Sequence, residues 1–327
     1  MSGAVFFVRL TYNSAVRLSF SRIDGWLLLM TFFWGSNFSI IKTAIREMPG
    51  PAFNGLRMVL ASLVFLVILG WRDGLRASLA KVERRDWVPI LVLSSVGHGL
   101  YQLLFLGGVA RTSVANSSLI FGLTPVTVSL MSAWLGHERP GWTRWAGTSL
   151  SLFGIYLVVA YAPQATSSLA GDVLIVGAML SWATYTVGTR PLLERYSPVF
   201  ITGLTMAIGT LMYAPFALLW LRGVDLRAVS PGGWAGIIYS ALFSLVAAYV
   251  IWYTAVREVG GGHTAIYSNI VPLVAMAIAA VVLHEPLTTL KIVGAAAVLG
   301  GVALTRLDVG GRGSGAAVDP GCPVHEG

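Results

Sequence analysis

Long apolar stretches separated by short polar connectors recur along most of the chain. Each stretch is close to twenty residues long, the length that an α-helix needs to cross a hydrocarbon layer of about 30 Å. The stretches are continuous, whereas the strands of membrane barrels alternate over about ten residues. The sequence therefore predicts an all-α integral membrane protein with ten transmembrane helices, over residues 24–45, 52–70, 87–108, 114–135, 142–161, 171–190, 198–221, 233–256, 263–283 and 287–305.

The second half of this pattern repeats the first at a constant offset, which indicates a duplicated unit. A shift of 147 positions aligns Pro125 with Pro272, His137 with His284, Glu138 with Glu285, Gly147 with Gly294 and Gly154 with Gly301. Each copy holds five helices, an odd number, so the second copy has to enter the membrane in the opposite orientation. Inverted repeats of this kind are typical of transporters that work by alternating access, with a site near the midplane.

The duplication predicts four parts of the chain. They are a cytoplasmic lead-in (residues 1–23), a first five-helix repeat (24–161), a second five-helix repeat (162–305) and a disordered cytoplasmic tail (306–327). The lead-in lacks the apolar core and cleavage site of a signal peptide, and a start codon placed too early would explain it equally well.

Composition supports a membrane protein and sets its orientation. The chain is 56% hydrophobic and 11% charged, with a mean hydropathy of +0.75, whereas soluble domains carry about 25% charged residues. The net charge of +8 comes from basic residues in the connectors, which favours topological anchoring over nucleic-acid binding. With the N-terminus inside, the inner segments hold 15 Lys and Arg residues and the outer segments hold 5. We therefore expect an inner-membrane protein with both termini in the cytoplasm.

Enzyme, metal and nucleotide signatures are missing from the sequence. The single cysteine, Cys322, excludes a disulfide framework and a thiolate metal site. The histidines next to Glu138 and Glu285 lack the H-E-x-x-H spacing, and no G-x-x-x-x-G-K-[ST] loop is present for nucleotide phosphates. We expect no cofactor, no bound metal and no enzymatic activity. Because each glutamate precedes a proline and a new span, its predicted role is to cap that helix.

Pro125 and Pro272 lie inside predicted spans at matching positions. A proline within a helix frees the carbonyl four residues earlier, here those of Phe121 and Ser268. In a bilayer such carbonyls need a partner or a cavity. The pair predicts matched kinks that shape a central cavity, although kinks satisfied by neighbouring helices would fit equally well.

Polar and aromatic residues within the spans are the candidates for a substrate site, because burying polar groups in lipid is costly. An interhelical hydrogen bond or an interfacial aromatic would explain any one of them equally well. The predicted substrate-binding residues are Trp34, Asn37, Lys42, His98, Tyr101, Gln102, Asn116, Trp182, Tyr185, Tyr249, Trp252, Tyr253 and Asn269.

Three charged or titratable residues within spans carry separate expectations. Lys42 follows Trp34 and Asn37 and is the predicted partner for an anionic group of the solute. Arg57 lies toward the outer end of its span, so we expect its side chain to reach the membrane surface. If a proton couples to transport, His98 is the mid-span side chain with a suitable ordinary pKa.

Several of these stretches resemble EamA-type transporters of the drug/metabolite transporter superfamily. The similar segments are WGSNFSIIKTAI (34–45) with NGLR (54–57), SVANSSLIFGLTPV (113–126) with GHE (136–138), and HTAIYSNIVPLVA (263–275) with LHEPLT (283–288). The resemblance implies ten helices in two inverted repeats and outward movement of small metabolites, often amino acids and their analogues. It also implies a cavity lined by the first, third, fourth, sixth, eighth and ninth helices.

The functional expectation is a secondary-active exporter of an amino-acid-like or amphipathic organic solute. Its partners would be the solute, the lipid bilayer and a coupling proton. Two alternatives stay open at this point. An importer of sugar- or nucleotide-linked metabolites would need more basic residues in the cavity. A passive channel would move solutes without coupling, and a membrane scaffold would move none.

Overall fold

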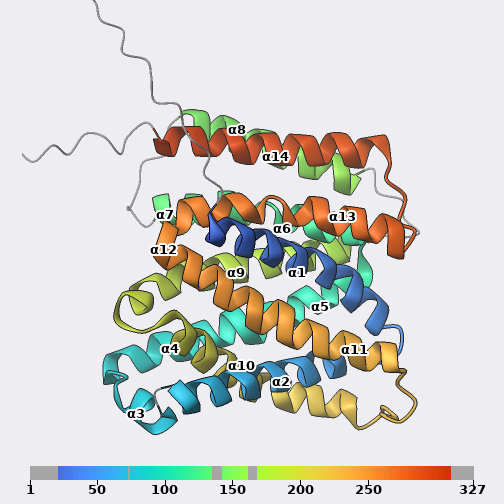
Figure 1. Ribbon diagram of the computed structural model, residues 1–327. Helices are drawn as coiled ribbons and strands as arrows, with labels where there is room; N and C mark the ends of the chain where they lie inside the picture. The colour runs from blue at the N-terminus through green and yellow to red at the C-terminus, as the bar shows by residue number, and fades with distance from the viewer. Residues whose placement is uncertain (1–20, 73, 135–141, 161–167, 311–327) are drawn as a thin grey trace, which may run out of the picture.

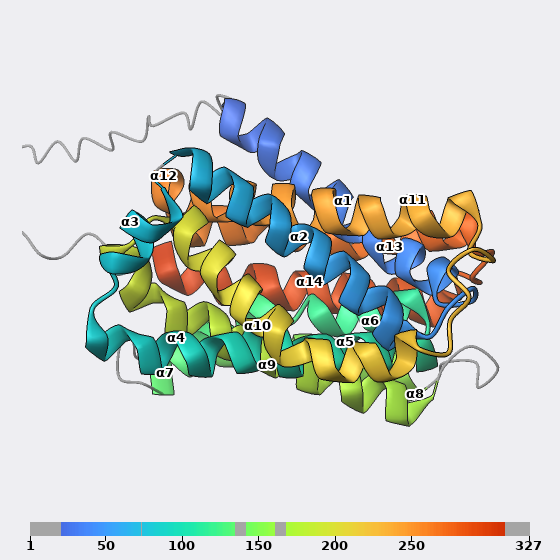
Figure 2. The same cartoon turned by 90° about the horizontal axis from the view of Figure 1, so that it is seen from below.

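The computed structural model describes residues 21–72, 74–134, 142–160 and 168–310. Within these ranges the protein is built of helices and has no strand, as the predicted all-α class requires. The helices run side by side between two ends of the molecule, with α3 at one end and the start of α11 at the other (Figures 1 and 2). The elements are α1 (Arg22–Ala44), α2 (Gly50–Arg72), α3 (Leu75–Ala80), η1 (Arg84–Asp86), α4 (Trp87–Ser94), η2 (Ser95–Leu100), α5 (Tyr101–Arg111), α6 (Val114–Phe121), α7 (Thr124–Trp134), α8 (Trp142–Ala160), α9 (Leu169–Arg195), α10 (Pro198–Leu221), α11 (Pro231–Tyr239), η3 (Ser240–Ala247), α12 (Ala248–Ser268), α13 (Val271–Val282) and α14 (Thr289–Gly310).

Serine side chains begin five of the described helices. In each case the hydroxyl oxygen accepts a hydrogen bond from a backbone N–H three residues later, which satisfies a donor that the helix leaves unpaired. In α10 and α11 a proline follows directly at the start of the helix, where its missing N–H costs nothing. The capping residues are Ser21, Ser113, Ser168, Ser197 and Ser230.

Two predicted spans are each divided into two helices just before a proline. The span 114–135 breaks between α6, which ends at Phe121, and α7, which begins at Thr124. The span 263–283 breaks between α12, which ends at Ser268, and α13, which begins at Val271. Both boundaries differ by the same 147 positions (268 − 121 and 271 − 124). The helix interruption therefore recurs at equivalent places in the two copies.

One predicted connector is helical in the structure. The sequence predicts a connector at residues 257–262, but α12 stays helical through it. At the equivalent place in the first copy the chain leaves the helix at Thr112, and the Ser113 hydroxyl then starts α6 by accepting from Asn116 N at 3.0 Å. Gly260 is equivalent to Ser113 at the repeat offset of 147, but it has no side-chain oxygen to cap a new helix.

Both copies contain a π-helical segment at related positions. η2 (Ser95–Leu100) separates α4 from α5, and η3 (Ser240–Ala247) separates α11 from α12. A π-helical turn holds an extra residue, so it changes which side chains share the inner face, and such turns occur frequently at functional sites. Sequence periodicity gave no sign of either segment.

The helices α8 and α14 pack against each other through glycines, and form the uppermost layer in Figure 1. A Cβ added at Gly154 would lie 2.7 Å from the carbonyl oxygen of Gly294, and one at Gly301 would lie 2.4 Å from that of Gly147. Gly154 and Gly301 are equivalent in the repeat, as are Gly147 and Gly294, so these are the same contact seen from each copy. Along α8 from Gly147 to Gly154, the contacted residue on α14 changes from Gly301 back to Gly294, so the two helices run antiparallel.

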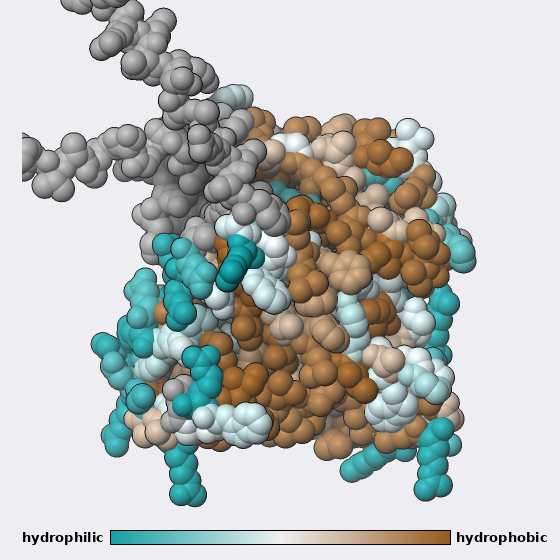
Figure 3. Space-filling model, in the orientation of Figure 1, coloured by the Kyte–Doolittle hydropathy of each residue, from teal (hydrophilic) through white to brown (hydrophobic). Residues whose placement is uncertain are grey.

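The surface has the character of a membrane protein. In Figure 3 apolar residues cover the middle of the visible face, and hydrophilic residues gather toward its two ends. Among the described residues, five helical stretches are long and apolar enough to cross a membrane by length and composition. These are Gly50–Arg72, Arg84–Arg111, Leu169–Arg195, Pro198–Leu221 and Pro231–Glu258, with shorter apolar helices at Val114–Val128, Val271–Val282 and Thr289–Leu304.

Candidate functional site

Five aromatic side chains from both copies meet in the interior, next to η2 and η3. The ring centroid of Trp34 lies 6.4 Å from that of Trp182 and 5.4 Å from that of Trp252. The Trp182 ring in turn lies 5.4 Å from Tyr101 and 5.3 Å from Tyr249. Trp34 and Trp182 are equivalent at a shift of 148, and so are Tyr101 and Tyr249. We call these five residues the aromatic cluster.

His98, Tyr185 and Tyr253 extend the aromatic cluster. The His98 ring is completely buried, with its centroid 5.0 Å from that of Tyr185. Its Nε2 lies 3.3 Å from the Thr205 hydroxyl, while its Nδ1 has no hydrogen-bond partner among the described residues. The Tyr253 ring lies 6.5 Å from that of Tyr249, and α12 carries both. The structure thus brings together eight of the predicted substrate-binding residues.

A buried arginine lies at the boundary between the two copies. Arg57, on α2, is 1% exposed, and its guanidinium makes three hydrogen bonds of 2.7 Å. Nε donates to Oδ1 of Asn54, Nη1 to Oγ of Ser240 on η3, and Nη2 to Oε1 of Gln102 on α5. The guanidinium also lies over the ring of Phe53, 5.7 Å from its centroid.

This polar group is connected to the aromatic cluster along two helices. The Ser240 hydroxyl that accepts from Arg57 donates to Oδ1 of Asn37 at 2.7 Å, and Asn37 lies one helical turn from Trp34 on α1. Gln102 follows Tyr101 directly on α5. Arg57, Asn37 and Gln102 therefore form a polar side of the same interior region.

The position of Arg57 corrects a prediction. The sequence predicts that its long side chain reaches the membrane surface, but the structure buries it among uncharged partners. Ser240 lies 183 residues away along the chain and Gln102 lies 45 residues away. The local signal was the spacing of Asn54 and Arg57, three residues apart, which places them on one helix face.

Two other predicted site residues, Lys42 and Asn116, belong to a separate polar cluster. Lys42 Nζ donates to the backbone carbonyl of Thr112, at the end of α5. The Thr112 hydroxyl donates to Oδ1 of Asp172 at 2.5 Å, and Asn116 Nδ2 lies 3.3 Å from the same oxygen. Asp172 is 4% exposed in the first turn of α9. Lys42 is thus engaged where α1, α5 and α9 meet, and not beside Trp34.

The remaining predicted residue, Asn269, lies in the break between α12 and α13. Its side-chain oxygen is buried and has no hydrogen-bond partner in the part of the chain that the structure describes.

Glu285 caps a helix, but a different one from that predicted. The sequence predicts that it caps the helix that follows it, which begins at Thr289. Instead its carboxylate accepts from the backbone N–H groups of Val114 at 2.9 Å and Ala115 at 3.3 Å, at the start of α6. A carboxylate at a helix N-terminus meets both unpaired donors and the positive end of the helix dipole. The matching Glu138 lies outside the described residues.

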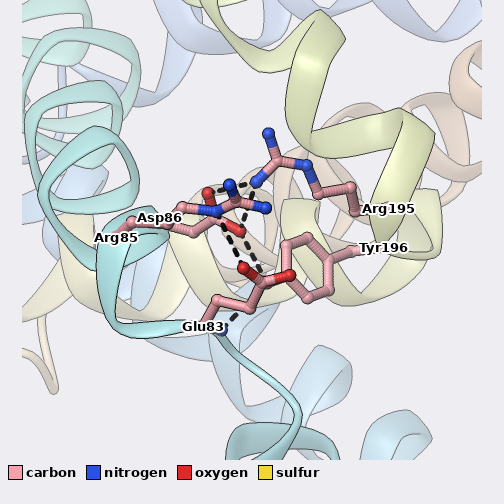
Figure 4. A network of polar contacts seen from close by, with 5 residues as sticks. All are labelled: Glu83, Arg85, Asp86, Arg195 and Tyr196. Atoms are coloured by element: carbon pink, nitrogen blue, oxygen red, sulfur yellow. Dashed lines mark hydrogen bonds and ion pairs between the residues drawn. The ribbon is translucent and has the colours of Figure 1, made fainter.

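Near the start of α4, an ion pair joins the two copies (Figure 4). Arg195 Nη1 lies 2.6 Å from Oδ1 of Asp86, and the Tyr196 hydroxyl donates to Oδ2 of Asp86 at 2.7 Å. The backbone N–H of Glu83 donates to the same hydroxyl at 3.0 Å. Burial raises the pKa of Tyr196, and the hydrogen bond to the Asp86 carboxylate adds to the rise.

Metal chemistry has no visible support in this interior. Across the described ranges, no three or more His, Cys, Asp or Glu side chains gather as a metal site would require. The interior instead offers aromatic faces, amides, hydroxyls and one guanidinium. Such a lining suits an organic solute with an apolar part and a polar end.

Comparison with known proteins assigns this arrangement to a family. The sequence profile of the EamA-like transporter family matches residues 21–160 and again residues 169–307. The chain belongs to the EamA-like transporter family. It is similar to the uncharacterized transporter YetK of Bacillus subtilis (strain 168), at 26% identity over 83% of this chain and 82% of YetK.

Two further similarities bear on function and fold. A protein of Streptantibioticus cattleyicolor named as a probable terminal-alkyne amino-acid exporter is 25% identical, over 88% of this chain and 94% of its own length. A solved crystal structure has a TM-score of 0.63 at 16% identity, covering 87% of this chain and 96% of the other. This EamA-like transporter is therefore a multi-pass membrane protein and not an enzyme, as the sequence predicted.

Proposed function

We propose that this EamA-like transporter is a secondary-active exporter of a small amino-acid-like or amphipathic organic solute. In this proposal ten transmembrane helices form two inverted repeats (24–161 and 162–305) that rock about a shared central site. Both termini lie in the cytoplasm, the protein is in the inner membrane, and a proton gradient drives the solute outward.

The observation that carries the proposal is the meeting of equivalent aromatic residues at the boundary between the repeats. Trp34 packs edge-on against Trp182, and Trp182 packs against both Tyr101 and Tyr249, so each repeat contributes matching rings to one place. Rocking of one repeat against the other would separate such rings and give the solute access from one side at a time. The antiparallel contact of α8 and α14 supports inversion, and the printed name of the Streptantibioticus relative supports an amino-acid-like solute.

Solute flux into and out of proteoliposomes tests the proposal. A panel of amino acids and amphipathic metabolites is offered with and without a pH gradient, and at least one solute should accumulate only with the gradient. Trp34→Ala and Trp252→Ala remove rings that line the proposed site, so we expect each to lower that flux at least tenfold.

Trp26→Ala is the matched control, because Trp26 lies on the same helix as Trp34 but is 55% exposed. It should leave flux unchanged when protein abundance is equal. Unaltered flux in both Trp34→Ala and Trp252→Ala would show that the site lies elsewhere. Flux that never responds to the gradient would point to a passive channel.

A further inference from the structure

The charge on Arg57 is not matched by any acidic side chain that the structure describes. Its three hydrogen bonds go to an asparagine, a serine and a glutamine, all of them neutral. Neutral acceptors satisfy the N–H donors but do not neutralise the positive charge of the guanidinium. Burying a charge that has no partner of opposite sign costs free energy. At 1% exposure, water does not compensate for this cost either. A negative group from outside the chain would balance this charge.

Two donors of the guanidinium remain for that group. A guanidinium carries five N–H donors, and the hydrogen bonds to Asn54, Ser240 and Gln102 use three of them. The two remaining hydrogens lie on Nη1 and Nη2, one on each nitrogen. A carboxylate can accept from both nitrogens in a fork when these two hydrogens point the same way, and this is the strong geometry of Arg–carboxylate pairs.

Gln102 provides a second observation that points to a ligand. Its Oε1 accepts from Arg57, but its Nε2 is buried without a hydrogen-bond partner among the described residues. Gln102 is 0% exposed, and an unsatisfied buried amide is uncommon in proteins. An anion on the guanidinium would have this amide beside it as a further donor. His98, one turn earlier, leaves a ring nitrogen unpaired in the same interior.

We propose that Arg57 and Gln102 form the subsite for the carboxylate of the transported solute, with the solute's apolar part against the aromatic cluster. This inference rests on the proposed function and narrows it to organic carboxylates. In this inference Arg57 replaces Lys42 as the anion partner, because Lys42 belongs to the separate polar cluster of Thr112, Asn116 and Asp172. Asn54 and Ser240 position the guanidinium from either side of the repeat boundary.

Matched pairs of acids and amides test the subsite in the purified full-length protein. Binding of phenylacetate is compared with that of phenylacetamide, and binding of L-phenylalanine with that of L-phenylalaninamide, by calorimetry in detergent. We expect wild-type protein to bind at least one acid tenfold or more tightly than its amide. Arg57→Gln should remove this preference, and Arg57→Lys should keep only part of it, because the fork is lost.

Gln102→Glu gives a test that does not depend on the stability of Arg57 variants. The new carboxylate has nearly the same shape and lies next to the guanidinium, so it supplies an internal counter-ion and competes with the solute. We expect the thermal midpoint to rise while the affinity for the acid falls at least tenfold. If Arg57 has a purely structural role, Gln102→Glu should raise the thermal midpoint without weakening the binding of the acid. Ser62→Ala is the control, since it removes a buried hydrogen bond of 2.8 Å between the same helix α2 and Thr210 of α10 that does not involve Arg57.

Different results would contradict the carboxylate subsite and the export function. The subsite is wrong if wild-type protein prefers no acid of the panel over its amide, if Arg57→Gln keeps the preference, or if Gln102→Glu leaves acid affinity unchanged. Export can still be correct in those cases, as flux in proteoliposomes would show. Conversely, an Arg57-dependent preference without flux would support the subsite and contradict export.

Discussion

Among single residues, Glu285 shows how one side chain can hold two distant parts of the chain together. Its carboxylate reaches the first turn of α6, 171 residues earlier in the sequence, and accepts from two backbone N–H groups there. Glu285→Ala should leave these donors without a protein acceptor. Loss of a helix cap lowers the free energy of unfolding by about 1 kcal/mol. We expect a decrease of that order in Glu285→Ala, together with faster hydrogen exchange of the Val114 and Ala115 amides.

The control for Glu285 is Glu194→Ala, which removes an exposed glutamate at the end of α9. It also removes one negative charge but should not change hydrogen exchange at α6. Unchanged exchange at Val114 and Ala115 in Glu285→Ala would mean that the cap is not formed in the membrane-embedded protein.

Residue types and their spacing predicted which aromatic side chains share the interior better than they predicted the contacts of the charged side chains. His98, Tyr101 and Gln102 recur at three- and four-residue spacing, which is enough to place them on one inner face. Apart from Asn54, which is three residues from Arg57, the partners of Arg57, Lys42 and Glu285 lie 45 to 183 residues away along the chain. No local pattern encodes such contacts. A cation between apolar residues has the same sequence signature whether it reaches the surface or is buried.

At the scale of elements, the pairing of α8 with α14 depends on glycines that allow backbones to touch. Gly301→Ala would place a methyl group 2.4 Å from the Gly147 carbonyl oxygen and 2.3 Å from the Ser151 hydroxyl oxygen, so the helices have to separate. Overpacking of this kind costs about 1–3 kcal/mol. We expect a lower thermal midpoint and a lower yield of folded protein.

Gly300 is the matched control for Gly301, since it is the preceding residue on α14. A Cβ there would meet only Leu150, at 3.9 Å, which is an ordinary contact. Gly300→Ala should leave the midpoint unchanged or raise it, because alanine favours a helix by about 1 kcal/mol over glycine. Equal effects of the two substitutions would contradict a specific role for the Gly301 contact.

Periodicity predicted where helices exist better than where they end. Pro125 and Pro272 pointed to the two interruptions, because a missing N–H acts locally. The continuation of α12 past residue 257 follows from the lack of a capping hydroxyl at Gly260, a weaker signal than the polar connector around it. The π-helical segments η2 and η3 each add one residue to a turn, a shift too small to stand out in a continuous apolar stretch.

For the whole molecule, the duplication is the strongest feature of the sequence and makes the most far-reaching prediction. If the repeats are inverted, equivalent connectors must lie on opposite sides of the membrane. Arg46, after α1, and Glu194, at the end of α9, are equivalent at a shift of 148 and are both exposed. Single cysteines at these positions, in a Cys322→Ser background, should react with an impermeant maleimide from opposite sides. We expect Arg46→Cys to be labelled in intact cells and Glu194→Cys only after the membrane is opened. Labelling of both from the same side would exclude inverted repeats, and with them the alternating access on which the export mechanism depends.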